Sequence, residues 1–330
     1  MYKKINIFLN NKINCTTKKY ALIIGLNPSK GARSPTLWNK VYKNLKINCK
    51  MYPVDISKKN LPKFIKEIKK DKNFVGSAVT MPYKEVIIRY IDEVHLSVKK
   101  IKSINTIVKK NNKLIGYNTD YLACKKTLTK FKRRKKILIL GAGGVGKSAI
   151  LSAAEVFKKA KIFIYNRNYR KLLKFSSNLK NNNIKILKNF NMISKMTGVD
   201  MVVNATSVGF DLWQKNKKGY FNLNIFSPIG VSKRLNIVKY KNYSNFFKKN
   251  IEIFKKNAFS TFEFFNKNKK CDVFDIIYYP AETPLIKISN QFSNKVFNGL
   301  DMNLDQAVLG FSIVNNIKNK NLIKKLMLKK

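Results

Sequence analysis

The feature that most constrains this chain is a short apolar run followed at once by a glycine-rich turn. Residues 137–148 read Ile-Leu-Ile-Leu-Gly-Ala-Gly-Gly-Val-Gly-Lys-Ser. The four apolar residues predict a buried strand, and the chain from Ser148 onward predicts a helix. A backbone without side chains can approach a phosphate closely, and a helix N-terminus offers unpaired N–H groups to hold it. The stretch therefore predicts a nucleotide-phosphate site.

The same stretch fits two phosphate-binding motifs. Its glycines have the spacing of the dinucleotide fingerprint, and together with Lys147 and Ser148 they also have the spacing of a P-loop. A P-loop protein needs an Asp that closes a later apolar strand and holds magnesium. The next such strand, Met201–Val203, is instead followed by Asn204. We favour the dinucleotide motif and keep a P-loop NTPase as an alternative.

A second apolar run indicates which dinucleotide binds. Lys161–Tyr165 ends about twenty residues past the last glycine, where a dinucleotide fold meets the adenosine ribose. NAD enzymes usually carry a carboxylate there, whereas this chain has Asn166, Arg167 and Asn168, with Arg170 close behind. A guanidinium suits a ribose 2′-phosphate, so the sequence predicts NADP.

Composition bounds the class of protein. The 330 residues are enough for two domains, each with its own core. Lys and Asn break the apolar runs within about ten residues, so we expect no membrane span, and the apolar part of the N-terminus is too short for a signal peptide. The cysteines Cys15, Cys49, Cys124 and Cys271 are scattered, and there is a single His. This pattern indicates no metal site and a reducing, cytoplasmic location.

The formal net charge of +51 could indicate binding to nucleic acid. However, Lys is spread along the chain together with Asn, Ile, Phe and Tyr, whose codons are all A/T-rich. Genome base composition therefore explains the charge without any partner. We find no nucleic-acid motif and expect no specific nucleic-acid partner, and we keep a basic nucleic-acid-binding protein as an alternative of another class. The charge should still attract anionic ligands, more strongly at low salt.

The N-terminal part alternates strand-like and helix-like stretches. We expect strands at Tyr20–Gly25, Asn48–Val54 and Val75–Val79, with helices between them at Pro35–Leu45 and Leu61–Lys69. This βαβ pattern predicts a mostly parallel sheet. Ser34 is expected to cap the first helix. Residues 1–19 are polar, and this composition predicts a poorly ordered extension or an added edge strand.

A series of short motifs along the chain resembles the shikimate dehydrogenase family. In chain order they are Ser34-Pro35, Val79-Thr80-x-Pro82-Tyr83-Lys84, Asn105-Thr106, Asn118-Thr119-Asp120, Gly141-Ala142-Gly143-Gly144, Asn166-Arg167, Asn204-Ala205-Thr206-Ser207, Asp275-x-x-Tyr278-x-Pro280 and Gly299-Leu300-x-Met302-x-x-x-Gln306-Ala307. So many matches in one order are far more specific than any single motif. The resemblance starts near residue 20 and leaves out about Asp211–Lys270, which we interpret largely as an insertion with helical and strand-like pieces.

The resemblance implies two α/β domains. A substrate-binding domain is expected at residues 1–125, completed by the last helices at 297–330, and a Rossmann NADP-binding domain at 130–290. A helix near Tyr121–Lys132 should connect the two and act as a hinge. The active site is expected in the cleft between the domains.

The resemblance also implies the reaction, which is the reversible reduction of 3-dehydroshikimate to shikimate by NADPH in chorismate and aromatic amino acid biosynthesis. Lys84 is the expected proton-transfer group, and Asp120 is the partner that positions it. Such a reaction needs a proton donor beside the carbonyl that receives the hydride. Without the resemblance, Lys84 would be interpreted as a solvated surface residue and Asp120 as a helix cap.

Further residues carry over as binding groups. For the substrate hydroxyls these are Thr80, Asn105 and Gln306, and for its carboxylate end Ser34 and Tyr278. For the cofactor they are Gly141, Ala142, Gly143 and Gly144 at the pyrophosphate, Asn166, Arg167 and Asn168 at the ribose phosphate, and Ile276 and Gly299 at the nicotinamide. Taken singly, each of these residues could also be a cap, a turn or a core residue.

One departure from the family affects the substrate loop. The family usually has His-Ser-x-Ser-Pro where this chain has Gly31-Ala32-Arg33-Ser34-Pro35. The hydroxyl missing at Ala32 would weaken substrate binding by about 1.5–3 kcal/mol, and we hypothesise that Arg33 pairs with the carboxylate instead. The nearest alternative is the same fold acting on quinate as well as shikimate, or using NAD. We expect a monomer or a homodimer.

Overall fold

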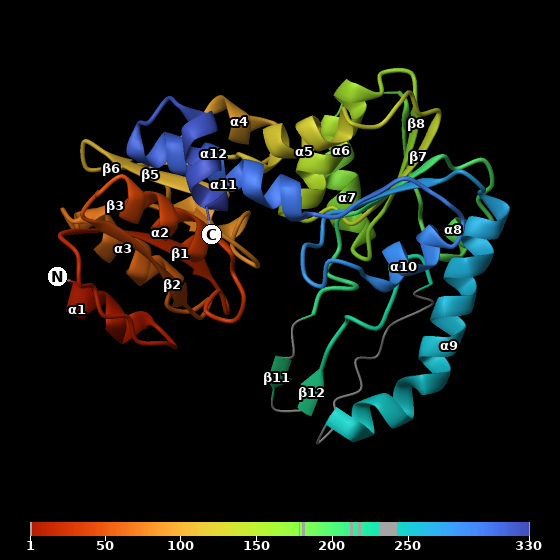
Figure 1. Ribbon diagram of the computed structural model, residues 1–330, viewed down its shortest axis with the longest axis horizontal. Helices are drawn as coiled ribbons and strands as arrows, with labels where there is room; N and C mark the ends of the chain where they lie inside the picture. Colours follow the sequence, from red (N-terminus) through yellow and green to blue (C-terminus); the bar gives the residue numbers. More distant parts are fainter. Residues whose placement is uncertain are drawn as a thin grey trace. The chain divides into compact units, whose positions relative to one another are not determined.

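The computed structural model describes residues 2–177, 179, 182–211, 214–216, 219–230 and 243–329. The chain divides into two compact units, Met1–Ala123 with Asn303–Lys330 (unit 1) and Cys124–Met302 (unit 2). The two divisions lie inside helices α5 (Asp120–Leu128) and α11 (Leu300–Asn315). Each unit is built from a sheet and helices (Figure 1), and the predicted two-domain α/β class with C-terminal helices returning to the first unit is confirmed.

Unit 1 contains a six-stranded mixed sheet of order β2-β1-β3-β5-β6-β4. Its strands are β1 (Lys19–Gly25), β2 (Cys49–Asp55), β3 (Phe74–Val79), β4 (Glu93–Val94), β5 (Thr106–Lys110) and β6 (Lys113–Tyr117). The first three pair in parallel, but β5 and β6 form an antiparallel hairpin that pairs antiparallel with β3. Asn111 and Asn112 have positive φ, which suits the two-residue turn of this hairpin. The parallel pairing predicted for the first three strands is confirmed, and β4 also pairs in parallel with β6, but the two antiparallel pairings of β5 make the sheet mixed.

Helices cover both faces of the unit 1 sheet. Along β1, Tyr20, Leu22 and Ile24 pack with α3 (Leu61–Lys70), and the alternate residues Ala21 and Ile23 pack with the other layer. That layer consists of α2 (Ser34–Asn44), α11 and α12 (Lys320–Leu328). Successive side chains of a strand point to opposite faces, so unit 1 has three layers with an apolar core on each side of the sheet.

The first residues of the chain pack on unit 1. They form α1 (Tyr2–Ile5) and the 3-10 helix η1 (Asn6–Phe8), and Ile5 and Ile13 are buried in the same core as α3. Leu9 forms an isolated bridge with Ile56, just after β2. The prediction of a poorly ordered extension or an added edge strand is therefore wrong, because the stretch forms helical turns with a single isolated bridge and its scattered apolar residues reach the core.

Unit 2 contains a six-stranded parallel sheet of order β14-β13-β10-β7-β8-β9. Its strands are β7 (Lys136–Leu140), β8 (Lys161–Tyr165), β9 (Ile184–Ile186), β10 (Met201–Asn204), β13 (Asp272–Asp275) and β14 (Val296–Phe297). This is the doubly wound order of dinucleotide-binding folds, in which ligands bind at the carboxyl ends of the central strands. Those ends belong here to β7 and β10.

Helices connect the strands of unit 2, and short elements complete unit 1. The helices of unit 2 are α6 (Gly144–Val156), α7 (Tyr169–Ser176), α8 (Asn191–Ser194) and α10 (Pro284–Asn290). The short elements of unit 1 are the 3-10 helix η2 (Val86–Tyr90) and α4 (Leu96–Lys99). In α6 the glycine turn leads directly into the helix, which begins four residues before the predicted Ser148.

The stretch interpreted as an insertion contains a hairpin of β11 (Gln214–Asn216) and β12 (Gly219–Phe221) and a 25-residue helix, α9 (Tyr243–Lys267). Residues 212–213, 217–218 and 231–242 of this stretch lie outside the described part of the chain. The second half of α9 packs on unit 2, with Phe264 and Phe265 in its core. The Asn257 side chain also accepts a hydrogen bond from Ser227 N at 2.8 Å.

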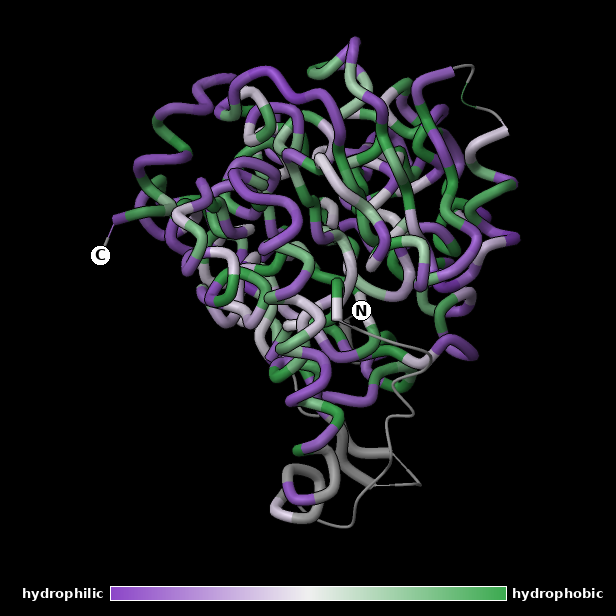
Figure 2. The backbone as a smooth tube through the Cα atoms, turned by 90° about the vertical axis from the view of Figure 1, so that its right-hand side faces the viewer, coloured by the Kyte–Doolittle hydropathy of each residue, from purple (hydrophilic) through white to green (hydrophobic). Residues whose placement is uncertain are grey.

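Hydrophilic residues are spread along the described chain and do not gather in one segment (Figure 2). Within the described residues, no helix has the length and apolar character needed to cross a membrane.

Candidate active site

Lys84 and Asp120 lie side by side in unit 1. Lys84 follows β3, and its carbonyl accepts a hydrogen bond from Ile104 N at 2.7 Å, which holds it next to the start of β5. Asp120 is the first residue of α5. The Lys84 Nζ donates to Asp120 Oδ2 at 2.6 Å, and the two side chains are 19% and 5% exposed. An ammonium held by a buried carboxylate, with part of its surface open, has the geometry that proton transfer needs.

Asn105 holds the other oxygen of Asp120. Its Nδ2 donates to Asp120 Oδ1 at 2.9 Å and to Thr119 Oγ1 at 2.8 Å, and its Oδ1 accepts from Thr119 N at 2.8 Å. Gln306 Oε1, on α11, lies 3.3 Å from the same Nδ2. The structure therefore brings four of the predicted residues into one hydrogen-bonded cluster, namely Lys84, Asn105, Asp120 and Gln306.

Thr80 lies next to this cluster at the carboxyl end of β3. Its N–H donates to Ile24 O at 2.9 Å, and the preceding Val79 N donates to Asn105 O at 2.8 Å. The Thr80 side chain is half-buried. The backbone bond between Val79 and Asn105 fixes Thr80 beside the amide that holds Asp120.

Ser34 is buried at the first residue of α2 and does not cap the helix. Arg33 occupies the N-cap with helical dihedral angles (φ −75°, ψ −25°) and makes no side-chain cap bond, so the predicted role of Ser34 as a cap is wrong. The Arg33 Nη1 donates to Asn303 Oδ1 at 3.2 Å. Asn303 precedes Gln306 by one helical turn, and its carbonyl accepts from Gln306 Nε2 at 2.9 Å.

In unit 2 the glycine turn follows β7 as predicted. Gly141 has a φ of +97°, which residues with side chains rarely adopt. A Cβ at Gly146 would collide with the Gly141 carbonyl, so only glycine lets the start of α6 approach the turn this closely. A Cβ at Gly143, by contrast, would meet no described atom within 4 Å. Gly143 therefore borders open space at the N-terminus of a 13-residue helix, where a pyrophosphate fits.

The residues after β8 are tied to this turn. Asn166 Oδ1 accepts from Ala142 N at 3.1 Å, and its Nδ2 donates to Asn168 O at 2.9 Å. Asn168 caps α7 by accepting from Lys171 N at 3.0 Å. Arg167, between the two asparagines, is exposed, and its guanidinium has no hydrogen bond or ion pair with another described residue. Arg167 is the cation here that a ribose 2′-phosphate could engage.

The geometry around Lys147 argues against the P-loop alternative. In a P-loop this lysine reaches the phosphates. Here its side chain is buried, and Nζ lies 5.3 Å from the centroid of the Phe175 ring on α7. β10 ends in Asn204, whose side chain bonds within unit 2 instead of offering a carboxylate to a metal ion.

The chain after β13 carries three more of the predicted residues. Gly299 N donates to Ile277 O at 2.8 Å, and a Cβ on Gly299 would collide with the Ile276 carbonyl, so the two backbone segments are in close contact. Tyr278 is half-buried, and its ring centroid lies 5.8 Å from that of Phe210. Tyr278 belongs to unit 2, whereas the other residues expected to bind substrate belong to unit 1.

Asp275, at the end of β13, is fully buried. Its Oδ1 accepts from Asn204 Nδ2 at 2.9 Å and from Ile277 N at 3.1 Å, and its Oδ2 accepts from Thr283 Oγ1 at 2.6 Å. Burial raises the pKa of Asp275 to about 7, and the three hydrogen bonds oppose this rise.

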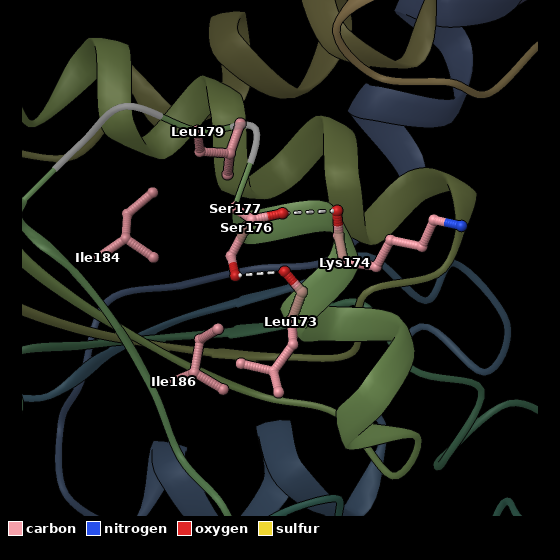
Figure 3. Close-up of a pocket in the computed structure, with 7 residues that line it drawn as sticks. All are labelled: Leu173, Lys174, Ser176, Ser177, Leu179, Ile184 and Ile186. Atoms are coloured by element: carbon pink, nitrogen blue, oxygen red, sulfur yellow. Dashed lines mark hydrogen bonds between the residues drawn. The ribbon is translucent and has the colours of Figure 1, made fainter.

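A surface pocket of unit 2 lies apart from these residues, between α7 and β9 (Figure 3). It has a volume of about 530 Å³ and is lined by Leu173, Lys174, Ser176, Ser177, Leu179, Ile184 and Ile186. Both serine hydroxyls donate to carbonyls of α7. None of the predicted site residues lines this pocket.

Unit 1 thus presents a lysine–aspartate pair surrounded by amides, and unit 2 presents a doubly wound sheet with a glycine turn and an exposed arginine. This combination defines the class of nicotinamide-dependent oxidoreductases that have a separate substrate-binding unit.

Comparisons with known proteins identify the family. Residues 23–107 match the family model described as shikimate dehydrogenase substrate binding domain, and residues 123–217 match the model described as shikimate / quinate 5-dehydrogenase. A shikimate dehydrogenase (NADP(+)) of Caldicellulosiruptor saccharolyticus is 31% identical over 294 residues, which are 86% of this chain and 88% of that relative. The chain belongs to the shikimate dehydrogenase family.

Solved structures agree with this assignment. The shikimate dehydrogenase of Aquifex aeolicus has a TM-score of 0.68 at 25% identity, covering 97% of this chain and all (100%) of the other. A shikimate dehydrogenase in complex with NADP+ has a TM-score of 0.65 at 26% identity, covering 96% of this chain and 97% of the other. The predicted family and its oxidoreductase class are confirmed.

Two residues near this cluster, Thr119 and Asn303, were not predicted as site residues from the sequence. Thr119 bonds Asn105 and also donates to Gln306 O at 3.1 Å. It lies inside the Asn-Thr-Asp motif, so the motif itself was a sufficient signal. Asn303 lies three residues before Gln306, and helical spacing places the two on one face. Its contact with Arg33 depends on tertiary structure and has no local signal.

Proposed function

We propose that this chain catalyses the reversible reduction of 3-dehydroshikimate to shikimate by NADPH, a step toward chorismate and the aromatic amino acids. The observation that carries the proposal is the Lys84–Asp120 pair, held by amides at the end of β3, in a member of the shikimate dehydrogenase family. The relatives named shikimate dehydrogenase (NADP(+)) and the relative solved with NADP+ support this substrate and this cofactor.

In the proposed reaction Lys84 moves the proton. When the substrate carbonyl becomes an alkoxide, the Lys84 ammonium donates a proton to that oxygen, and in the reverse direction the Lys84 amine accepts it. Asp120 stays a carboxylate and holds Nζ in place through the 2.6 Å hydrogen bond. Asn105 occupies the second Asp120 oxygen, so the carboxylate cannot rotate away from Lys84 without breaking that bond.

The same cluster supplies groups for the substrate. We propose that Thr80, Asn105 and Gln306 bind the substrate hydroxyls. Ser34, together with Tyr278 of unit 2, is assigned to the substrate carboxylate. Arg33 donates a hydrogen bond to Asn303, which lies one helical turn before Gln306 and accepts a hydrogen bond from it. These contacts support the proposed pairing of Arg33 with the substrate carboxylate.

NADPH, when bound, supplies the hydride. The residues of unit 2 fit such a group, because Gly143 borders open space at the N-terminus of α6 and Arg167 is exposed beside the capped start of α7. We assign the pyrophosphate to Gly141–Gly144 and the 2′-phosphate to Asn166, Arg167 and Asn168. The backbone at Ile276 and Gly299 is assigned to the nicotinamide.

We also propose a cytoplasmic enzyme that works as a monomer or homodimer. None of its four cysteines forms a disulfide bond, as expected in a reducing compartment.

Quinate is the second candidate substrate, favoured by the lack of a hydroxyl at Ala32. A panel of shikimate and quinate, each with NADP+ and NAD+, separates the candidates through kcat/KM. We expect shikimate with NADP+ to exceed every other pair by roughly tenfold or more. Equal values for the two substrates would favour the quinate alternative, and no turnover with any pair would refute the proposal.

A further inference from the structure

Asp275 differs from Asp120 and Asp272, two other buried carboxylates of the chain. Asp120 and Asp272 each have a cation beside them, Lys84 and Arg134 respectively. Asp275 is fully buried, and every hydrogen-bond donor that the structure gives it is neutral. A buried carboxylate without a cation is unfavourable, so it calls for an explanation beyond packing.

We propose that Asp275 is a positioning residue that fixes the segment 276–283, and with it Tyr278, relative to the end of β10. The inference rests on the proposed function in one respect, which is that Tyr278 binds the substrate.

One oxygen of Asp275 holds the start of this segment. Asn204 and Asp275 are register partners at the ends of two parallel strands. The Asn204 Oδ1 already accepts from Thr206 N at 3.0 Å and from Thr206 Oγ1 at 2.8 Å, so its NH2 group must point toward Asp275 Oδ1. The same Oδ1 receives the Ile277 N–H, immediately before Tyr278.

The other oxygen holds the end of the segment. Asp275 Oδ2 accepts the Thr283 hydroxyl at 2.6 Å. The oxygen of that hydroxyl in turn caps α10, by accepting from Ile286 N at 3.3 Å. One carboxylate therefore holds both ends of the segment that carries Tyr278.

The Asn204 side of this network is also held by backbone hydrogen bonds that do not involve Asp275. Asn204 is also in register with Leu140 of β7, and Ala205 N donates to Leu140 O at 2.8 Å. Ile276 N donates to the Asn204 carbonyl at 2.9 Å, a backbone bond that does not involve the carboxylate. Loss of the Asp275 contacts should therefore shift Tyr278 and leave the glycine turn in place, which predicts a larger effect on shikimate than on NADP+.

The charge of Asp275 gives this arrangement a pH dependence. The groups that face it are neutral: the Asn204 amide from β10, the hydroxyl of Thr283 at the N-cap of α10, and the Ile277 N–H. Because burial raises its pKa to about 7, the carboxylate accepts all three bonds above this pH. Below it, the added proton competes with a donor for one oxygen, and the network loosens. The KM for shikimate should therefore rise as the pH falls through this range.

Three variants test the inference in the full chain. Asp275→Asn keeps the shape but replaces Oδ2 with an NH2 group, which cannot accept from Thr283. Thr283→Val removes the same hydrogen bond from the other partner, and Thr283→Ser keeps the hydroxyl as a matched control. We expect Asp275→Asn and Thr283→Val to raise the KM for shikimate roughly tenfold, with kcat and the KM for NADP+ within about twofold. Asp275→Asn should also flatten the pH dependence of the shikimate KM, and Thr283→Ser should behave as wild type.

Hydrogen exchange gives a readout that does not depend on catalysis. The backbone of residues 276–283 should exchange faster in Asp275→Asn than in wild type, while residues 141–146 keep their protection. An unchanged shikimate KM with the wild-type pH profile would overturn the inference, and so would a parallel loss in kcat and both KM values. A wild-type protein without shikimate turnover would instead contradict the proposed function, and exchange at 276–283 would still decide the role of Asp275.

Discussion

At the scale of single residues, the account depends on one lysine among many. Its ammonium is bound by a carboxylate that is itself almost completely buried, and it keeps a fifth of its side-chain surface exposed (19%). Asn105 then fixes the carboxylate through its second oxygen. A lysine held in this way has lost most of the orientational freedom of the surface lysines, which is what a proton donor with a fixed target requires.

Replacing Lys84 by Ala removes the proposed proton donor. We expect kcat to fall by roughly 10²–10⁴, with little change in the KM for NADPH, because the cofactor is assigned to unit 2. Steady-state kinetics in both reaction directions measure this. Lys100→Ala, which removes an exposed lysine at the end of α4, is the control and should keep the wild-type kcat. A Lys84→Ala variant with an unchanged kcat would remove Lys84 from the mechanism.

Arg167 is the residue that we propose sets the preference between the two coenzymes. The variant Arg167→Ala should lower the preference for NADPH over NADH by about 1.5–3 kcal/mol, because a charge-assisted contact with the 2′-phosphate is lost. The ratio of kcat/KM for the two coenzymes reports this directly. Lys174→Ala removes an equal charge from the last turn of α7 and should leave the ratio unchanged. If Arg167→Ala also left it unchanged, another group would bind the 2′-phosphate.

At the scale of elements, the turn between β7 and α6 contains one glycine in close contact with backbone, Gly146, and one that borders open space, Gly143. Gly146→Ala would push a methyl group into the Gly141 carbonyl and should lower the stability of unit 2 by about 1–3 kcal/mol. The methyl group added by Gly143→Ala would meet no described atom within 4 Å, so this variant should keep a melting temperature near that of wild type. Its KM for NADP+ should rise, because the pyrophosphate is assigned to this turn. Thermal melts and cofactor titrations distinguish the two. Equal melting temperatures would contradict the close approach at Gly146.

Elements with a strong local pattern were predictable from the sequence. The apolar run before the glycines became β7, and the predicted helix at Leu61–Lys69 became α3 with one more residue. The antiparallel hairpin β5–β6 was missed, because the βαβ pattern that precedes it does not continue and the Asn-Asn turn gave a weak local signal. The packing of residues 1–19 was missed because only a few apolar residues, such as Ile5 and Ile13, carry it.

The candidate site was predictable to a smaller extent than the elements. Lys84 and Asp120 were named only through the family resemblance, since 36 residues separate them and no spacing rule joins them. The network around Asp275 was not predicted at all. Its members Asn204, Asp275 and Thr283 come from two strands and a helix cap, so they meet only when the parallel sheet forms.

At the scale of the whole molecule, charge is the dominant property. The chain has 68 Lys and Arg against 17 Asp and Glu. NADP and shikimate are both anions, so the field of the protein should favour their approach at low ionic strength. We expect both KM values to rise several-fold between roughly 0.05 and 0.5 M salt, while kcat stays constant. KM values that do not vary with salt would show that the charge has no part in ligand capture.

The division into two units also matters at this scale. The proposed proton donor and the proposed cofactor residues belong to different units, and both connections between the units are helical. The predicted hinge role of α5 fits this connectivity and stays a prediction.

The most direct test of the central claim is the absorbance of reduced nicotinamide during turnover. Purified protein is mixed with NADPH, and 3-dehydroshikimate is then added. The account predicts a loss of NADPH absorbance that starts only on addition of the substrate and is nearly abolished in Lys84→Ala. Absorbance that stays constant in the wild-type protein, or falls equally fast in Lys84→Ala, would contradict it.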